Sequence, residues 1–382
     1  MRTKGILPTL LFVCLTTVFG TAQKYTITDL GPLAPTGINS LAQVVGNNDN
    51  QAYVWSFGRM KALGLLPGGT FSQAAGINDL GAVTGTADGA GTIAVSDIQC
   101  PTVTQPFVWT ANAGMRGLGT TDVAGFSIEF GSPLCSLAFY GRSINARMHV
   151  VGDETGPSTY AFGFSWTSTN GMSLFGLSWP PTFANNISKT EEIVGQDSTP
   201  FDLSYGIGHA VTWKNGNETV LEDLGAGQSS YGASADGVND QGIVVGWSTI
   251  SPVNFGVTSS PTHATLWTPS GAITDLGTLP GDTSSVALRI NLYGQVIGSS
   301  GDTLYGGSSC CNTPPFVVIG RPFIWTQSSG MQDLNTLIHS NSGWVLNTAT
   351  DINVWGQVVG NGTLNGQPHG YLLTPKNPFQ QH

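Results

Sequence analysis

The chain has 382 residues, 13 of them basic and 23 acidic, and charged residues make up only 9% of it. Hydrophobic residues make up 40%, enough for a core, which excludes intrinsic disorder of the charged, hydrophobe-poor kind. The acidic balance and the scarcity of lysine and arginine argue against a nucleic-acid partner, because binding to a phosphate backbone needs clustered basic residues.

Residues 1–22 have the pattern of a secretory signal peptide. Two basic residues precede an apolar stretch over 6–19, and small residues follow at 20–22. This stretch is too short and too interrupted for a membrane-spanning helix, and no later segment is apolar enough to be one. We therefore expect an exported, soluble protein with no membrane span in the mature chain. It is expected outside the cell, with the periplasm as the alternative.

One short phrase recurs seven times along the chain. It consists of Ile-Asn, or a close variant, with the glycine of a Val-Val-Gly-like run seven residues after the asparagine. These positions define repeats one to seven in chain order: Asn39, Asn78, Asn145, Ser188 (where serine replaces asparagine), Asn239, Asn291 and Asn353. Regular internal similarity of this kind indicates a repeat architecture.

Each repeat is predicted to hold four short strands. The first ends at Ile-Asn, and the phrase Asn-x-x-Gly, as in 78–81, predicts a hairpin whose glycine takes the left-handed conformation. Ala42, Met148 and Glu191 replace that glycine in three repeats, at some conformational cost. The Val-Val-Gly run is the second strand, and an aromatic-rich run is the third. A Leu-Gly phrase such as 272–277 is the fourth.

The third strand ends in tryptophan in six of the seven repeats. These residues are Trp55, Trp109, Trp166, Trp213, Trp267 and Trp325. A residue type fixed at one strand position follows the packing repeat, whereas a ligand engages only a few repeats. We therefore expect these tryptophans in the core.

The spacing of the repeats selects the architecture. Successive phrases lie 39 to 67 residues apart, which is longer than a β-helix rung and suits four-stranded propeller blades. Residues 25–31 match the fourth-strand phrase but precede repeat one, whereas repeat seven lacks a fourth strand. We predict that 25–31 pair with 369–374, which removes an exposed sheet edge.

The expected fold class is therefore all-β: a seven-bladed β-propeller of four-stranded blades, closed by the N-terminal strand. It forms a single domain over residues 23–374, and residues 375–382 are a C-terminal tail.

The phrases at 43–46, 76–78, 263–267 and 274–281 resemble the bacterial extracellular HAF-repeat family. The resemblance covers nearly all of residues 25–374 and implies an exported repeat protein, but it implies no reaction. The sequence departs from the pattern at Ser188 and in lacking the terminal tryptophan of repeat seven. It also has the histidine that begins strand three in only three repeats, at His209, His263 and His369.

Four cysteines follow the first 22 residues: Cys100, Cys135, Cys310 and Cys311. An even number in an exported protein suggests disulfides. Cys100 and Cys135 lie in segments that emerge on one face of repeat two, so we predict a bridge between them. For Cys310 and Cys311, in repeat six, a vicinal bridge and two free thiols both stay open.

The long insertions mark one face of the predicted ring. They lie at 86–105, 120–140, 196–208, 247–262 and 299–321, between strands two and three or after strand four. Loops on a rigid scaffold often bind ligands. The opposite face is trimmed to tight turns.

Five aspartates follow strand two on the long-loop face: Asp49, Asp88, Asp153, Asp197 and Asp302. Because Ca²⁺ prefers oxygen ligands, Asp153, Asp197 and Asp302 are the metal candidates. The alternative interpretation is that they are solvated loop residues. The three histidines of strand three are interpreted as structural.

Standard catalytic signatures are absent from the sequence, which contains no Gly-x-Ser-x-Gly, His-Glu-x-x-His or phosphate-binding Gly-Lys-Ser/Thr. We assign no catalytic residue and, apart from the Ca²⁺ candidate, no cofactor. We interpret the chain as a monomeric, non-catalytic extracellular binding or surface-interaction protein whose ligand is a glycan or a protein. The alternative is a secreted enzyme that acts on polysaccharide through carboxylates on the long-loop face.

Overall fold

The computed structural model describes residues 24–92, 99–120, 138–155, 161–175, 182–197, 208–225, 232–251, 261–305 and 316–376. Within these ranges the chain is all-β, as predicted, and one short 3-10 helix, η3 (Leu334–Leu337), is the only helix. Residues 1–22, Cys135, Cys310 and Cys311 lie outside the described residues. Cys100 lies in a strand, but its side chain is not among those described.

Repeats one to six supply four strands each. Those of repeats one to three are β2 (Ala34–Ile38), β3 (Val44–Asn48), β4 (Gln51–Ser56), β5 (Arg59–Ala62), β6 (Ser72–Ile77), β7 (Val83–Thr92), β8 (Gln99–Thr110), β9 (Gly114–Gly117), β10 (Ala138–Ile144), β11 (Val150–Thr155), β12 (Ala161–Thr167) and β13 (Gly171–Phe175). Those of repeats four to six are β14 (Phe183–Ile187), β15 (Ile193–Asp197), β16 (His209–Lys214), β17 (Asn217–Val220), β18 (Ala233–Val238), β19 (Val244–Thr249), β20 (Thr262–Trp267), β21 (Ile273–Asp275), β22 (Ser284–Ile290), β23 (Val296–Tyr305), β24 (Phe316–Thr326) and β25 (Gly330–Asp333).

Repeat seven differs from the others. Its first strand is interrupted into β26 (Trp344–Leu346) and β27 (Asp351–Ile352), and β28 (Val358–Leu364) and β29 (Gln367–Pro375) follow. The fourth position in this sheet is taken by the N-terminal strand, β1 (Tyr25–Asp29), which runs antiparallel to β29. Tyr25 lies opposite Pro375 and Asp29 opposite Tyr371, which is the pairing expected for residues 25–31.

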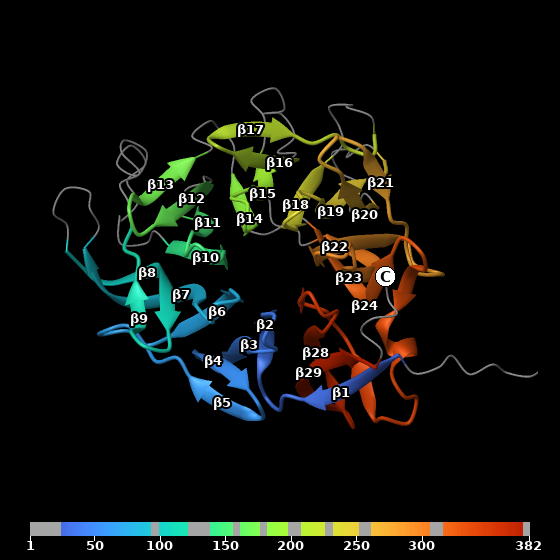
Figure 1. Cartoon of the computed structure of the whole chain (residues 1–382), viewed down its shortest axis with the longest axis horizontal. Helices are drawn as coiled ribbons and strands as arrows, with labels where there is room; N and C mark the ends of the chain where they lie inside the picture. Colours follow the sequence, from blue (N-terminus) through green and yellow to red (C-terminus); the bar gives the residue numbers. More distant parts are fainter. Residues whose placement is uncertain are drawn as a thin grey trace, which may run out of the picture.

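The antiparallel sheets follow one another around a ring (Figure 1). The first strand of each repeat lies nearest the centre and the fourth lies at the outer edge (Figure 1). Each inner strand contacts the inner strand of the next repeat, and β27 contacts both β22 and β2. Repeats two and three share one eight-stranded sheet because Ala138 pairs with Thr104 of β8.

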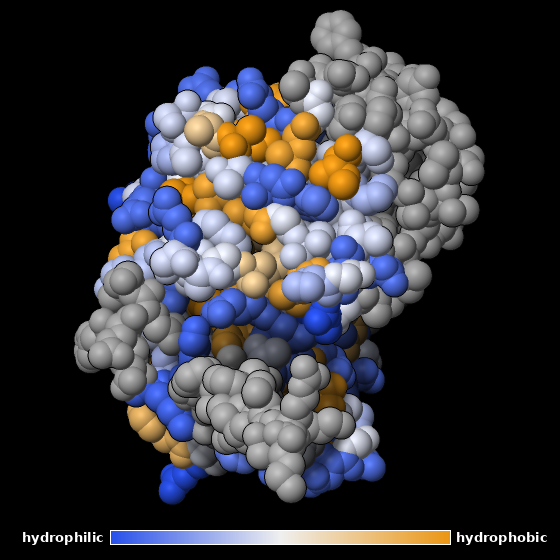
Figure 2. All heavy atoms as spheres, turned by 90° about the vertical axis from the view of Figure 1, so that its right-hand side faces the viewer, coloured by the Kyte–Doolittle hydropathy of each residue, from blue (hydrophilic) through white to orange (hydrophobic). Residues whose placement is uncertain are grey.

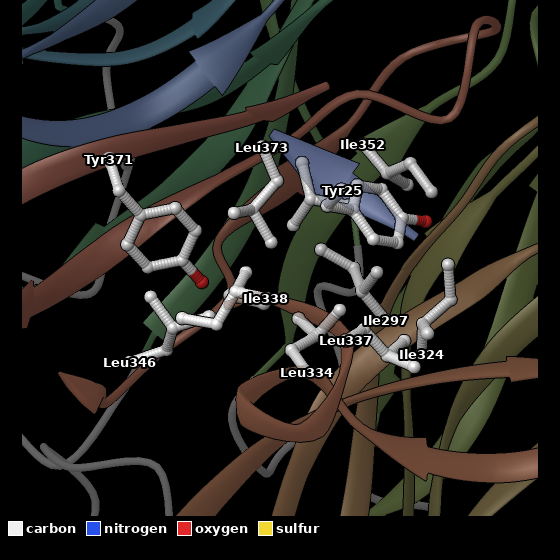
Figure 3. Packing of buried hydrophobic residues seen from close by; sticks show 12 residues of the cluster. Tyr25, Ile297, Ile324, Leu334, Leu337, Ile338, Leu346, Ile352, Tyr371 and Leu373 are labelled. Carbon is white, nitrogen blue, oxygen red and sulfur yellow. The ribbon is translucent and has the colours of Figure 1, made fainter. Parts of the chain in front are cut away.

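The N-terminal strand is also anchored by a hydrophobic cluster (Figure 3). Tyr25 of β1 and Leu373 of β29 pack with side chains of repeat six and of the segment that follows it. These partners include Ile297, Ile324, Leu334, Leu337 and Ile338, all buried. The Lys24 amide donates to the Leu337 carbonyl at 3.0 Å.

The prediction that the repeated tryptophans belong to the core is confirmed. Trp109, Trp166, Trp213 and Trp267 are buried. Trp55 and Trp325 are half-buried and pack against hydrophobic clusters of the ring. The repetition of this residue therefore follows from packing.

The turns between strands one and two also form as predicted. Ala42, Met148 and Glu191, which replace glycine, have φ angles of 55°, 62° and 64°. A glycine such as Gly81 takes the same left-handed conformation, with φ at 78°. The turn geometry is therefore kept even where the residue is unfavourable for it.

A second repeated glycine has a reason that the sequence did not reveal. In repeats one to six the first strand carries a β-bulge just before Ile-Asn. A Cβ added at Gly85 would lie 1.9 Å from the Gln73 carbonyl oxygen, and one at Gly195 would lie 1.8 Å from that of Phe183. The glycine of Val-Val-Gly is needed because the first strand approaches it too closely for any side chain.

The described parts of two of the expected long loops are strands instead. In the segment 86–105, β7 and β8 stay paired as far as Thr92 and Gln99. In the segment 299–321, β23 and β24 stay paired as far as Tyr305 and Phe316. Both segments contain β-branched runs, which favour extended pairing over loop structure.

Candidate functional site

The repeated asparagine organises the turn that follows it. In repeat two, Asn78 Oδ1 accepts hydrogen bonds from the amides of Leu80 at 3.0 Å and Ala82 at 2.9 Å. The same side chain reaches the neighbouring repeat, because Asn78 Nδ2 donates to the Asn145 carbonyl at 2.8 Å. The sequence predicted the turn but not this link between repeats.

The link recurs around the ring. The side-chain amides of Asn39, Asn145, Asn239 and Asn291 each donate to the carbonyl of the equivalent residue in the next repeat. Asn353 completes the circuit by donating to the Asn39 carbonyl at 3.0 Å. The series is interrupted only after repeat four, where Ser188 has no amide to donate. There, the Lys189 amide donates to Asp240 Oδ1 at 3.0 Å.

A cavity of about 200 Å³ lies at the centre of the ring. We call it the central cavity, and all seven repeats line it through their inner strands and the turns that follow. Four polar side chains project from the position two residues before the repeated asparagine or serine: Ser143, Asn186, Arg289 and Asp351. Repeats one, two and five have glycine at this position, where the inner strand of the next repeat approaches closely.

Two arginines and three aspartates set the charge in and beside the central cavity. Arg142 pairs with the buried Asp153 through two hydrogen bonds, of 2.6 and 3.2 Å. Arg289 Nη1 donates to the Asp236 carbonyl at 2.8 Å. Burial raises the pKa of Asp351, and Arg289 and two backbone amides only partly offset this effect. Burial likewise raises the pKa of Asp236 to about 6.

An ion-pair cluster lies at the end of the cavity formed by the tight turns. Lys189 Nζ of repeat four lies 2.9 Å from Asp79 Oδ2 of repeat two and 3.4 Å from Asp240 Oδ2 of repeat five. Burial alone would raise the pKa of Asp79, but hydrogen bonds from Lys189 and Ser40 bring it below its ordinary value. The lysine therefore spans the turn of repeat three, where Ala146 is small.

Large apolar side chains occupy the turns at this end of the ring in four of the repeats. The residue two positions after the repeated asparagine is Leu41, Leu80, Tyr293 or Trp355 in repeats one, two, six and seven, and these four form what we call the apolar rim. Their exposed fractions are 61, 72, 51 and 49%. The four repeats are consecutive in the ring. The other three repeats have Arg147, Thr190 and Gln241 there.

Trp355 is held in place despite its exposure. Its indole N–H donates to the Ser40 carbonyl of repeat one at 2.8 Å, so the ring lies across the junction between two repeats. An exposed aromatic ring that is fixed in this way offers contact area at little entropic cost. On the outer side of the ring seen in Figure 2, apolar residues gather in the upper half of the view and alternate with hydrophilic ones elsewhere.

The side chains of the three candidate metal ligands lie in different repeats and bind different partners. Asp153 binds Arg142 in repeat three, Asp197 Oδ1 accepts from Thr182 in repeat four at 2.7 Å, and Asp302 Oδ1 accepts from Thr283 in repeat six at 3.2 Å. They therefore do not fit one shared cation. In the part of the chain that the structure describes, no group of three or more metal-ligating side chains occurs.

The aspartates after strand two instead hold the chain that enters strand one of their own repeat. Asp88 Oδ1 accepts from the amides of Thr70 and Phe71 at 2.6 and 2.7 Å, just before β6. Asp197 and Asp302 bind threonines at the same place in their repeats. Asp49 is exposed.

The interpretation of the strand-three histidines as structural is confirmed for two of them. His263 Nδ1 lies 2.8 Å from Asp275 Oδ2, and His369 Nδ1 lies 2.8 Å from Asp29 Oδ1. Both aspartates belong to the fourth-strand phrase. His209 begins β16 at the matching position.

One carboxyl group stands apart from these networks. Glu154 in β11 is 2% exposed, and its Oε1 has no hydrogen-bond partner. Its strand neighbours are Phe139 and Phe162. Burial, and secondarily the charge of Asp153, raise the pKa of Glu154 to about 8. A raised carboxyl pKa is typical of catalytic acids, but this side chain is closed off from solvent.

No protein-family model and no curated protein matches the chain. Solved structures of similar fold include an oligogalacturonate lyase in complex with manganese, with a TM-score of 0.53 and 12% identity over 94% of this chain and 96% of that chain. A streptogramin B lyase has a TM-score of 0.51 and 10% identity over 92% and 98%. The β-propeller domain of the Trilobed protease from Pyrococcus furiosus has a TM-score of 0.45 and 10% identity over 92% and 95%.

Identities this low relate folds and not activities. They agree with the ring of antiparallel sheets, so the chain has a propeller-like all-β fold. Among the described residues, no helix has the length and apolar character required to cross a membrane.

Proposed function

We propose that this protein is an exported, seven-bladed β-propeller of the bacterial extracellular HAF-repeat type, which binds an extracellular ligand without transforming it. The ligand site is the end of the central cavity formed by the tight turns, together with the apolar rim. The proposal thus moves the binding face from the long loops to the opposite side of the ring.

Seven blades and closure by the N-terminal strand are supported by the sheet order. Seven repeats contribute inner strands, the eight-stranded sheet holds two of them, and β1 takes the fourth place beside β29. Closure of this kind removes a free sheet edge from an exported protein. Export itself is supported by the pattern of residues 1–22.

The observation that carries the binding function is the clustering of exposed apolar side chains. Among the described residues, eleven large hydrophobic ones are exposed, and five of them lie in the turns between strands one and two: Leu41, Leu80, Leu292, Tyr293 and Trp355. Exposed apolar groups that gather around a cavity mark interaction sites more often than scattered ones do.

The alternative, a polysaccharide-cleaving enzyme, has less support. Hydrolysis by carboxylates needs two of them on either side of one bond. Asp88, Asp197 and Asp302 each accept hydrogen bonds within their own repeat, and Asp153 is paired with Arg142. Glu154, the only one of these acids with a strongly raised pKa, is buried.

The test compares the mature wild-type protein with Trp355→Ala on a glycan array and on a panel of immobilised extracellular proteins. We expect at least one saturable ligand, and a loss of binding of tenfold or more in the variant. Phe57→Ala is the matched control, because Phe57 is 91% exposed on the same face but lies in the outer turn between β4 and β5.

Equal binding by wild type and Trp355→Ala would rule out the proposed face. Release of new reducing ends or unsaturated sugars from any bound glycan would favour the enzyme instead.

A further inference from the structure

The central cavity is polar and has donors that the chain itself does not use. Among the residues that the structure describes, the side chains of Ser143 and Asn186 form no hydrogen bond, and Arg289 uses only Nη1. All three belong to inner strands of different repeats, so they face the cavity from different directions. Polar groups that converge on a cavity and are free to bind a ligand are typical of small-molecule sites.

The charge of the lining favours a neutral ligand. Three cationic and three anionic side chains line the cavity: Arg142, Lys189, Arg289, Asp79, Asp240 and Asp351. Lys189 already lies between two of these aspartates, and Arg142 is paired with Asp153. A charged ligand would leave one set of side chains without its partner, which is costly in a half-enclosed site.

The size and composition of the cavity narrow the class of ligand further. Pockets for drug-sized ligands measure about 300 Å³ or more, whereas this one measures about 200 Å³. No aromatic side chain is among the described residues that line it, so it offers no surface on which a nucleobase could stack. A small ring with several hydroxyl groups fits both the volume and the mixture of donors and acceptors.

We propose that the central cavity holds one neutral sugar residue of an extracellular glycan, an inference that rests on the proposed function. Asn186, Ser143 and Arg289 donate to its hydroxyl groups, and Asp351 accepts from them. The rest of the glycan leaves across the apolar rim, where Trp355 presents a fixed ring to the C–H face of the next sugar.

Asn186→Ala and Ser143→Ala are the variants of choice, because neither side chain has a partner in the described structure whose loss would unfold the protein. Isothermal titration calorimetry compares a neutral hexose with its uronic acid, galactose with galacturonate and glucose with glucuronate. We expect one neutral hexose to bind at least tenfold more tightly than its acid. Each variant should weaken that binding about fivefold or more, the usual effect of one lost hydrogen bond.

Asn217→Ala, at an exposed asparagine of the outer strand β17, is the matched control and should bind as wild type. Melting temperatures of all variants should agree. Binding of the uronic acid as tight as that of the hexose, or unchanged binding by Asn186→Ala, would overturn the inference.

The two failures can be told apart. If Trp355→Ala loses a protein ligand while no hexose binds, the proposed function stands and the sugar site falls. If Trp355→Ala binds every ligand as tightly as the wild type does, the proposed function itself is wrong.

Discussion

The two ends of the ring are held together in different ways. At the tight-turn end, six repeats use the same side chain, an asparagine, to bind the next repeat. At the long-loop end, Asp88, Asp197 and Asp302 hold segments of their own repeat. The first end joins repeats through one side chain that recurs around the ring, whereas the second adds contacts within a repeat, beside links to the next repeat made by Asn47 and Gln196.

The contacts within a repeat favour insertions at the long-loop end. A contact within a repeat tolerates changes in its neighbours, so loop length can vary there. A contact between repeats requires both partners to keep their geometry, so the turns stay short. The ligand site that we propose uses the side where backbone positions are most strictly fixed.

The largest effect on the free energy of unfolding is expected at Glu154, near the long-loop end, and it depends on pH. Its pKa is raised from the ordinary 4.5 to about 8 in the folded protein, so the folded state keeps a proton that the unfolded chain has lost. The free energy of unfolding should therefore fall by about 1.4 kcal/mol per pH unit between these two values. This contribution is complete below the lower pKa and lost above the higher one.

Urea unfolding of wild type and Glu154→Gln at pH 5, 6, 7 and 8 measures this pH dependence. The variant replaces the ionisable carboxyl group with a neutral amide. The difference between the two proteins isolates Glu154 from Asp236, whose pKa is also raised. Glu222→Gln, at an exposed glutamate, should keep the wild-type slope. Parallel curves for wild type and Glu154→Gln would contradict the prediction.

At the tight-turn end, Asn291→Ala should lower the free energy of unfolding by about 2–4 kcal/mol, because it leaves several buried polar groups without partners. The Asn353 carbonyl loses a donor, and the amides of Tyr293 and Gln295 lose their acceptor. Chemical denaturation measures the loss, with Asn217→Ala on the outer strand as the control. A cost near that of the control would mean that the links between repeats contribute little.

Ser188→Asn sharpens the same comparison by restoring the missing link. An asparagine there should donate to the Asn239 carbonyl as its counterparts do, and raise the free energy of unfolding by about 1 kcal/mol. A thermal melt of the variant beside wild type is sufficient. A lower melting temperature would show that this junction has been rebuilt around serine and the Lys189–Asp240 contact.

The smallest effect is expected for Lys189→Met. The lysine side chain is 52% exposed, so its ion pairs with Asp79 and Asp240 should contribute less than about 1 kcal/mol. The difference from wild type should shrink as salt is added, because salt screens exposed charges. A difference that is large and independent of salt would assign Lys189 a packing role instead.

Much of the fold could be predicted because the same sequence pattern recurs in each of the seven repeats. The turn after Asn78, the buried Trp213 and the pairing of residues 25–31 with β29 all follow from comparing repeats. The lengthened strands near Thr92 and Tyr305 could not be predicted this way, since they occur in single repeats.

The candidate site was missed for a related reason. Ser143, Asn186, Arg289 and Asp351 are far apart in the chain and differ from one another, so no motif connects them. They become neighbours only when the ring forms. Aligning the repeats gives one signal that could have found them, because the position before Ile-Asn changes from glycine to a polar residue in four repeats.

The pairing of β1 with β29 also imposes an order in time. The first strand of the sequence cannot find its place until the last has been made, so its hydrogen-bonding edge stays unpaired until then. Contacts that join such distant segments form slowly, and an unpaired strand can meet another copy first. The yield of folded protein should therefore depend on how quickly the final repeat follows the others.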